Sequence, residues 1–153
     1  MVKILFVCHG NICRSTMAQF VFLHLAGQQG RAGEFYVDSA GISAEELGHP
    51  VHSGTRRKLA QMGIPCGEHR ARVLQKREYG EFDLLIGMDD GNLRGMRRIL
   101  GGDPDGKVHT LLEYADRPGE SIADPWYTGN FETTFADVMA GCQGLLKQLT
   151  ERD

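Results

Sequence analysis

Residues 2–19, VKILFVCHGNICRSTMAQ, decide the fold of this chain. A run of apolar residues ends abruptly at Cys8, and a helical pattern of apolar residues begins just after Arg14. This order predicts a buried strand, a tight loop and the N-terminus of a helix. In open α/β sheets, ligands bind at the carboxyl ends of the strands. We therefore expect a ligand-binding loop immediately after Cys8.

Strand and helix patterns alternate along the rest of the chain. Strands are predicted at residues 34–40, 82–88 and 108–112, helices at residues 55–62, 74–79, 91–100 and 131–149, and a long loop at 113–130. His52-Ser53 and Asp89-Asp90 have the character of helix N-caps. This alternation predicts an α/β three-layer sandwich with a parallel sheet. The length of 153 residues fits one domain, residues 1–153.

The composition favours a globular protein that does not bind nucleic acid. The formal net charge is −3 and the isoelectric point is near 6.1, whereas nucleic-acid-binding domains normally carry a basic surplus. No apolar run predicts membrane insertion, and the N-terminus has no signal-peptide pattern, so we expect a cytoplasmic location. The cysteines are then expected to be reduced at rest. The sequence contains no CxxC pair, which argues against a zinc site. His49 and His52 lack a third ligand at a sensible spacing, so we expect neither a metal nor a cofactor.

The loop after Cys8 has the chemistry of a phosphoryl-binding site. Residues 9–14 can curl so that successive backbone N–H groups point inward, and the next helix adds the positive end of its dipole. Arg14 offers a planar, permanently charged fork that matches two phosphoryl oxygens. Cys8 would then lie beneath the phosphorus, where the same donors favour the nucleophilic thiolate. Ser15 is placed to donate a hydrogen bond to that sulfur.

A proton donor is also needed, because the hydroxyl of a tyrosine leaving group has a pKa near ~10. Asp-Pro pairs occur at Asp103 and Asp124. Asp103 lies in a glycine-rich turn, where Asp-Pro is ordinary turn chemistry. Asp124 lies in the long loop before the last helix, followed by Trp126 and Tyr127, which could wall a slot and stack on a phenyl ring. We therefore predict that Asp124 is the general acid.

The predicted site thus consists of catalytic residues and of residues that bind phosphate and substrate. Cys8, Arg14 and Asp124 are the catalytic residues. Gly10 permits close backbone approach, and Asn11 tolerates a left-handed conformation while its side chain can lock the loop. The phosphate- and substrate-binding set is His9, Gly10, Asn11, Ile12, Cys13, Ser15, Trp126 and Tyr127.

Most of the chain resembles the low-molecular-weight protein tyrosine phosphatases. The resemblance is carried by CHGNICRS (residues 8–15), VDSAG (37–41), FDLLIGMD (82–89) and ADPWY (123–127). It implies a flavodoxin-like, four-stranded parallel sheet of order 2-1-3-4, flanked by helices. It also implies that phosphotyrosine monoesters are hydrolysed through a phosphocysteine, without a metal.

The resemblance further implies roles for individual residues. Asn11, Ser39 and His69 would form the hydrogen-bond network that holds the loop open. Cys13 would form a reversible disulfide with Cys8 that protects the nucleophile from over-oxidation. The expected partner is a phosphotyrosine-containing protein, with a tyrosine kinase as one candidate, and inorganic phosphate is the product. We expect a monomer.

Three other functions share the C-x5-R loop. Arsenate reductases rely on additional cysteines and typically lack the Asp-Pro acid loop, whereas Asp124-Pro125 is present here. Protein-arginine phosphatases of the same family tend to have Thr where this chain has Ile12. A non-catalytic phosphoryl-binding module would not need the whole catalytic set. One departure from the family is the pair Glu45-Glu46, where an aromatic residue is common, and this acidic rim would disfavour very acidic phosphopeptides.

Overall fold

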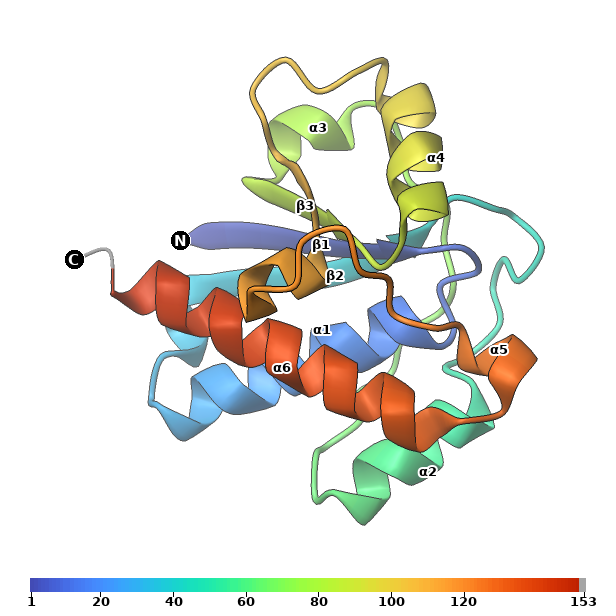
Figure 1. Cartoon of the computed structure of the whole chain (residues 1–153), viewed down its shortest axis with the longest axis vertical. Helices are drawn as coiled ribbons and strands as arrows, with labels where there is room; N and C mark the ends of the chain where they lie inside the picture. The colour runs from blue at the N-terminus through green and yellow to red at the C-terminus, as the bar shows by residue number, and fades with distance from the viewer. Residues whose placement is uncertain (152–153) are drawn as a thin grey trace.

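β1 (Val2–Cys8) lies in the middle of a parallel sheet whose strand order is β2-β1-β3-β4 (Figure 1). The computed structural model describes residues 1–151. β1 pairs with β2 (Phe35–Gly41) on one side and with β3 (Leu84–Gly87) on the other, and β3 pairs with β4 (Val108–Thr110). The predicted sheet topology is confirmed.

Helices cover both faces of this sheet, which confirms the three-layer sandwich (Figure 1). One face is covered by α1 (Arg14–Gln28), α2 (Ser53–Gln61) and α6 (Phe131–Thr150). The other face is covered by α3 (Glu78–Glu81) and α4 (Asp90–Leu100). Short helices complete the connections: 3-10 helices at Ala32–Glu34 and Leu111–Ala115, and α5 at Pro125–Thr128.

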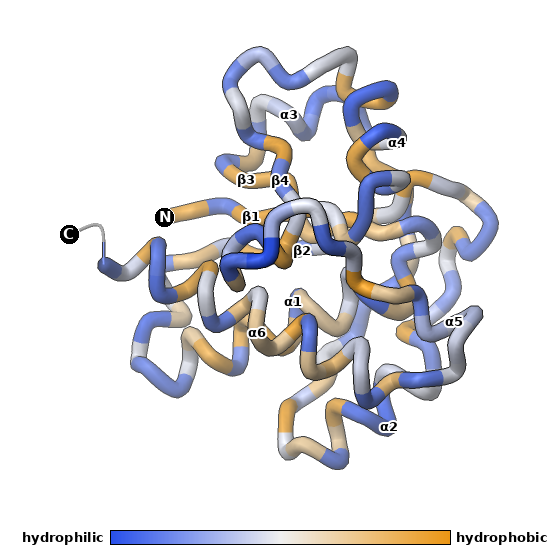
Figure 2. The backbone as a smooth tube through the Cα atoms, viewed as in Figure 1, coloured by the Kyte–Doolittle hydropathy of each residue, from blue (hydrophilic) through white to orange (hydrophobic). Residues whose placement is uncertain are grey.

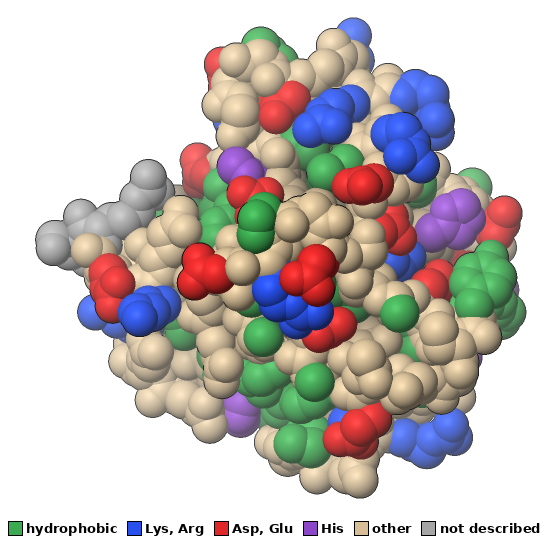
Figure 3. Space-filling model, viewed as in Figure 1, with side chains coloured by type: hydrophobic (Ala, Val, Ile, Leu, Met, Phe, Trp, Pro, Cys, Tyr) green, Lys and Arg blue, Asp and Glu red, His purple; other side chains and the backbone are tan. Residues whose placement is uncertain are grey.

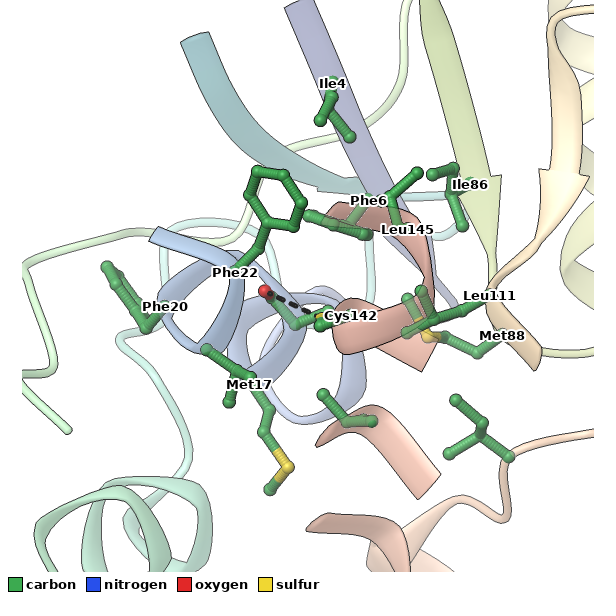
Figure 4. Packing of buried hydrophobic residues seen from close by; sticks show 14 of the residues in the cluster. Ile4, Phe6, Met17, Phe20, Phe22, Ile86, Met88, Leu111, Cys142 and Leu145 are labelled. Atoms are coloured by element: carbon green, nitrogen blue, oxygen red, sulfur yellow. Dashed lines mark hydrogen bonds between the residues drawn. The ribbon is translucent and has the colours of Figure 1, made fainter. Parts of the chain in front are cut away.

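Alternating side chains of β1 fill the two cores. Ile4 and Phe6 point toward α1 and α6, whereas Leu5 and Val7 point toward α4, and all are fully buried. Figure 4 shows Phe6 among side chains of the core between the sheet and helices α1 and α6. One of them is Phe22, whose ring centre lies 6.1 Å from that of Phe6. A strand buried on both faces reads as a continuous apolar run, which explains why β1 stands out in the sequence.

The hydropathy along the backbone follows this pattern of burial (Figure 2). Hydrophobic residues lie along β1 and β3, and polar residues cover much of α2 and α4 (Figure 2). Arg94, Arg97 and Arg98 are exposed on α4, where Figure 3 shows a basic patch. Among residues 1–151, no helix combines the length and the apolar character that a membrane span requires.

Three connections differ from the sequence predictions. The helix predicted at residues 74–79 is wrong in its bounds: α3 occupies Glu78–Glu81, and the Glu78 carboxylate at its start binds Arg72 and the Gln75 N–H group. The last strand ends at Thr110, where a capping box with Glu113 starts a 3-10 helix.

The third difference is in the long loop predicted at residues 113–130, which contains the short helix α5. Asp124 caps this helix and Pro125 occupies its first turn, a position that proline favours. The cap assignments for two longer helices are confirmed, since His52 caps α2 and Asp89 caps α4.

Candidate active site

A pocket opens at the carboxyl end of β1, where the sequence predicts the ligand-binding loop. It is lined by Cys8, His9, Gly10, Ile12, Cys13, Arg14, Glu45, Glu46, Asp124, Trp126 and Tyr127. The structure therefore brings the three predicted catalytic residues together, although Asp124 is far from the other two in sequence. The remaining predicted binding residues, Asn11 and Ser15, lie behind the loop and are buried.

The loop turns back sharply because Asn11 adopts a left-handed conformation, with φ of 61°. The carbonyl group of His9 accepts hydrogen bonds from the N–H groups of Ile42 and Ser43, which anchors the loop to the end of β2. Gly41 is required at this contact, since a Cβ atom there would lie 2.7 Å from the His9 carbonyl oxygen. The end of the VDSAG segment (residues 37–41) thus holds the loop in place.

The backbone of the loop is ready to bind an anion. Within residues 1–151, the N–H groups of residues 9–13 donate to no acceptor in the protein. The N-cap of α1 is Cys13, whose side chain makes no capping hydrogen bond, whereas α2, α4, α5 and α6 are capped by side chains. Free amides at a helix N-terminus attract phosphoryl groups.

A chain of hydrogen bonds aims a hydroxyl group at the sulfur of Cys8. The amide group of Asn11 donates to Ser15 Oγ over 2.8 Å, and Ser15 Oγ lies 3.0 Å from Cys8 Sγ. Because Ser15 accepts from Asn11, its own proton is available for a hydrogen bond to the sulfur. The structure places Ser15 beside the sulfur, where the sequence predicts it.

The predicted supporting residues meet behind the loop. Asn11 donates to Ser39 Oγ, Ser39 donates to Gln19 Oε1 over 2.6 Å, and His69 Nε2 lies 2.8 Å from Asn11 Oδ1. Since Asn11 Oδ1 can only accept, His69 carries its proton on Nε2. Burial, together with Arg72, outweighs the opposite influence of Asp38 and holds the pKa of His69 below its ordinary value.

An ion-pair cluster closes this network on its outer side. Arg72 binds Asp38 and Glu78, and its backbone N–H group donates to Asn11 Oδ1 over 3.1 Å. Asp38 Oδ1 also lies 3.6 Å from His69 Nδ1. Burial lowers the pKa of Arg72, but its bonds to Glu78 and Asp38 raise it well above the ordinary value. Arg72 is therefore always charged.

Arg14 is buried and held from behind. Its Nη1 donates to Asp89 Oδ2 over 2.6 Å and to the Ile122 carbonyl oxygen over 2.9 Å, and its Nη2 lies 3.5 Å from Asp124 Oδ2. Burial alone would lower the pKa of Arg14, but the neighbouring Cys8 and Asp89 raise it. In the described part of the chain, Arg14 Nε has no acceptor, so the Nε–Nη2 edge is available to a ligand.

Asp124 faces the loop as the N-cap of α5. Its Oδ1 accepts from the Trp126 N–H group over 3.0 Å, which leaves Oδ2 toward Arg14. The alternative, Asp103, lies outside the pocket. Its carboxylate accepts from Tyr79, Lys107 and Val108, and although burial opposes them, these bonds hold the pKa of Asp103 below its ordinary value. Asp103 is a turn residue.

The pocket mouth has two chemically different sides. Trp126 and Tyr127 form one side and are 56% and 82% exposed. Glu45 and Glu46 form the other side, as the sequence predicts. His9 Nε2 lies 3.5 Å from Glu45 Oε2 across this rim.

Cys13 shares the pocket with Cys8, and both thiols are free. Burial, the nearby Cys8 and Asp124 raise the pKa of Cys13 to about 12, so that it is a thiol at neutral pH. Cys142 is buried in the core, where its Sγ donates to the Ala18 carbonyl oxygen, and burial raises its pKa (Figure 4). The Cys8–Cys13 disulfide stays a prediction.

The sequence analysis did not identify every residue of the site. Asp89 was assigned only as a helix cap, yet it also holds Arg14. Its position directly after the apolar run 82–88 was an available signal, because parallel strands end at the same edge of the sheet. Gln19 and Arg72 left no comparable signal. Within residues 1–151, no cluster of His, Cys, Asp and Glu is suited to a metal ion.

Known proteins share this fold and sequence over almost the whole chain. A family model described as low molecular weight phosphotyrosine protein phosphatase matches residues 3–153. The low molecular weight protein-tyrosine-phosphatase YfkJ of Bacillus subtilis (strain 168) is 38% identical over 150 residues, which cover 97% of this chain and 96% of that protein.

Solved structures agree with this assignment. The crystal structure of YfkJ from Bacillus subtilis has a TM-score of 0.95 at 36% identity, covering 100% of this chain and 97% of that chain. A Drosophila arginine phosphatase has a TM-score of 0.88 at 29% identity, covering 99% of this chain and 100% of that chain. This chain therefore belongs to the low molecular weight phosphotyrosine protein phosphatase family.

Proposed function

We propose that this protein hydrolyses phosphotyrosine monoesters in proteins through a phosphocysteine on Cys8. The observation that carries the proposal is the shared pocket of Cys8, Arg14 and Asp124 beneath a loop of free N–H groups. Its tyrosine specificity is supported by the relative YfkJ, which is named a protein-tyrosine-phosphatase. The reaction has two displacement steps at phosphorus.

In the first step, the Cys8 thiolate attacks the phosphorus atom and the bond from phosphorus to the tyrosyl oxygen breaks. The protonated carboxyl group of Asp124 gives its proton to that oxygen, and tyrosine leaves. In the second step, the Asp124 carboxylate takes a proton from water while the water oxygen attacks the phosphocysteine. The P–S bond breaks, inorganic phosphate leaves and the thiolate is restored.

The loop stabilises the charge that develops on the phosphoryl oxygens. The N–H groups of residues 9–13 and the Nε–Nη2 edge of Arg14 are preorganised donors, because Asp89 and the Ile122 carbonyl group fix the guanidinium. Donors held in place in this way cost no reorganisation during the reaction. Arg14 thus takes the part that a metal ion plays in other phosphatases.

The aromatic side of the mouth supports an aromatic leaving group. Trp126 and Tyr127 are exposed beside Asp124 and can stack on a phenyl ring. Arginine phosphatase is the second candidate, since a relative of that name shares the fold. Ile12 favours tyrosine, because an apolar side chain in the loop gives a guanidinium no hydrogen-bond partner.

The experiment compares phosphotyrosine, phosphoserine, phosphoarginine and arsenate, the last with a thiol reductant, using the purified protein in a chelator. We expect turnover of phosphotyrosine alone at a substantial rate. Faster turnover of phosphoarginine would identify an arginine phosphatase, and arsenate reduction would identify a reductase. The proposal also includes a reducing, cytoplasmic compartment that keeps Cys8 a free thiol, a monomeric protein, and a tyrosine kinase as one candidate substrate.

A further inference from the structure

We propose that His52 is a positioning residue for the general acid. This inference rests on the proposed function, in which Asp124 donates the proton. His52 does not line the pocket. Instead, its backbone and ring connect the phosphoryl-binding loop, the loop of Asp124 and the start of α6, so that three separate segments meet at one side chain.

The ring of His52 is fixed by its position at the start of α2. Its backbone N–H group donates to the Ile12 carbonyl oxygen over 2.9 Å, which ties it to the phosphoryl-binding loop. Its Nδ1 accepts from the Gly54 N–H group over 2.9 Å. Because Nδ1 accepts, the ring carries its proton on Nε2 and cannot rotate without losing the helix cap.

The fixed ring packs against the loop that carries Asp124. Its centre lies 5.6 Å from that of Trp126, with the planes 80° apart, an edge-to-face contact. The backbone N–H group of Trp126 is also the group that holds the Asp124 carboxylate. Trp126 is 56% exposed, and this ring contact with His52 holds the residue whose N–H group binds Asp124.

The residue that follows the Asp124 loop, at the start of α6, also packs on the His52 ring. Phe131, the first residue of α6, stacks on His52 with ring centres 5.5 Å apart and planes 18° apart. Phe131 lies so close to Gly54 that a Cβ atom there would overlap its ring. Thr134 Oγ1 donates to the Ala123 carbonyl oxygen over 3.0 Å. Figure 1 shows α5 beside α2 and the start of α6.

The consequence concerns proton transfer rather than phosphoryl binding. Without the ring, the loop of α5 loses its support, and the Asp124 carboxyl group is held less closely to the leaving oxygen. A small misplacement of a catalytic group can cost about 10²-fold in rate. The loss should depend on how much the leaving group needs a proton. The N–H groups that bind the phosphoryl group lie in a different loop and keep their geometry.

The experiment separates the ring from the helix cap with two variants. His52→Asn keeps an N-cap acceptor but removes the ring, and His52→Phe keeps a ring but removes the acceptor. His24→Asn on α1 is the matched control. For each protein we measure kcat/KM, which reports the first displacement step alone, with phenyl phosphate, a poor leaving group, and with p-nitrophenyl phosphate, a good one. We also measure inhibition by inorganic phosphate and the melting temperature.

For His52→Asn we expect kcat/KM with phenyl phosphate to fall roughly tenfold, and kcat/KM with p-nitrophenyl phosphate to fall less than about twofold. Phosphate inhibition should not change. His52→Phe should retain kcat/KM with both substrates but melt at a lower temperature. Equal losses for the two substrates in His52→Asn, or a loss in His52→Phe as large as in His52→Asn, would overturn the inference.

Asp124→Asn distinguishes this inference from the proposed function. If Asp124→Asn shows the dependence on the leaving group and His52→Asn does not, only the role of His52 is wrong. If Asp124→Asn shows no such dependence, Asp124 is not the acid, and both the proposed mechanism and the role of His52 are wrong.

Discussion

Asn11 combines a backbone conformation and a side-chain network that no other residue in the loop can supply. Its φ of 61° is costly for most residues other than glycine, and asparagine is among the few side chains that tolerate it. Its amide group donates to Ser15 and Ser39, and its carbonyl oxygen accepts from His69 and Arg72. The conformation of the loop and the hydrogen bond to Cys8 therefore depend on one side chain.

Two variants of Asn11 separate these contributions. Both Asn11→Ala and Asn11→Gly leave buried partners without hydrogen bonds, and each should lower kcat by at least about tenfold. Asn11→Ala should be less stable than Asn11→Gly by about 1 kcal/mol, because only alanine is strained at positive φ. Urea unfolding and steady-state kinetics provide the measurements. Near-normal kcat in Asn11→Gly would show that the amide network is dispensable.

Glu45 should select among phosphopeptides. Its side chain is 73% exposed at the pocket mouth, where residues next to a phosphotyrosine would pass. Exposed ion pairs contribute about 0.2–1 kcal/mol, so Glu45→Lys should lower KM for a peptide with acidic flanks, and raise it for one with basic flanks, by up to about fivefold.

A control substrate and a control variant accompany this measurement. Phenyl phosphate has no flanking residues, and its KM should not change in Glu45→Lys. Glu81→Lys, on the distant helix α3, should leave both peptides unaffected. If peptide KM values do not move in Glu45→Lys, the acidic rim does not contact the substrate.

Helix α4 links the core on its own face of the sheet to Arg14. Asp89 Oδ1 accepts from the Asn92 N–H group over 2.7 Å and caps the helix, while Oδ2 holds Arg14. One carboxylate therefore starts an element and orients a catalytic group. Capping alone makes Asp89 recognisable in the sequence, whereas its second role depends on the packing of β3 beside β1.

Asp89→Asn tests the second role while keeping the first. Asparagine remains a good N-cap, so the melting temperature should change little. An amide group in place of Oδ2 cannot pair with the guanidinium, and inhibition by inorganic phosphate should weaken roughly tenfold. Asp90→Asn, the exposed neighbour, is the matched control and should behave like the wild type. Unchanged phosphate inhibition in Asp89→Asn would contradict the role of Asp89 in holding Arg14.

At the scale of the whole molecule, local patterns predict the elements that begin with a cap or a continuous apolar run. β1, α2 and α4 follow this rule. The pattern fails where a contact outside the expected helix decides its bounds, as at Glu78, which begins α3 and binds Arg72. The network behind the loop has the same origin, because Gln19 and Arg72 meet Asn11 and Ser39 only after β2 has paired with β1.

Stability should depend on pH through groups that the fold keeps neutral. The pKa of His69 is lowered by burial from an ordinary value of 6.5, so the unfolded chain binds the proton more tightly. The contribution of neutral His69 is thus present above pH 6.5 and is lost as the pH falls. Buried thiols act in the opposite direction: burial raises the pKa of Cys142 from 9.0, so stability is lost as the pH rises above that value.

Urea unfolding of wild-type protein and His69→Gln between pH 7.5 and pH 5.5 checks the acid side of this dependence. We expect His69→Gln to be less stable at pH 7.5 and to lose less stability than the wild type on acidification. His24→Gln, outside the network, should retain the wild-type slope. Parallel pH profiles for wild type and His69→Gln would show that another group controls the acid side.

The account depends most on Cys8 as the nucleophile, and rapid acid quenching followed by mass spectrometry tests this directly. During turnover of p-nitrophenyl phosphate, the wild-type protein should gain one phosphoryl group that maps to Cys8. Asp124→Asn should accumulate more of this species, because Asp124 also activates the water that hydrolyses it. Cys8→Ser should show neither the adduct nor turnover while still binding phosphate. Turnover without a phosphocysteine, or substantial activity in Cys8→Ser, would contradict the mechanism.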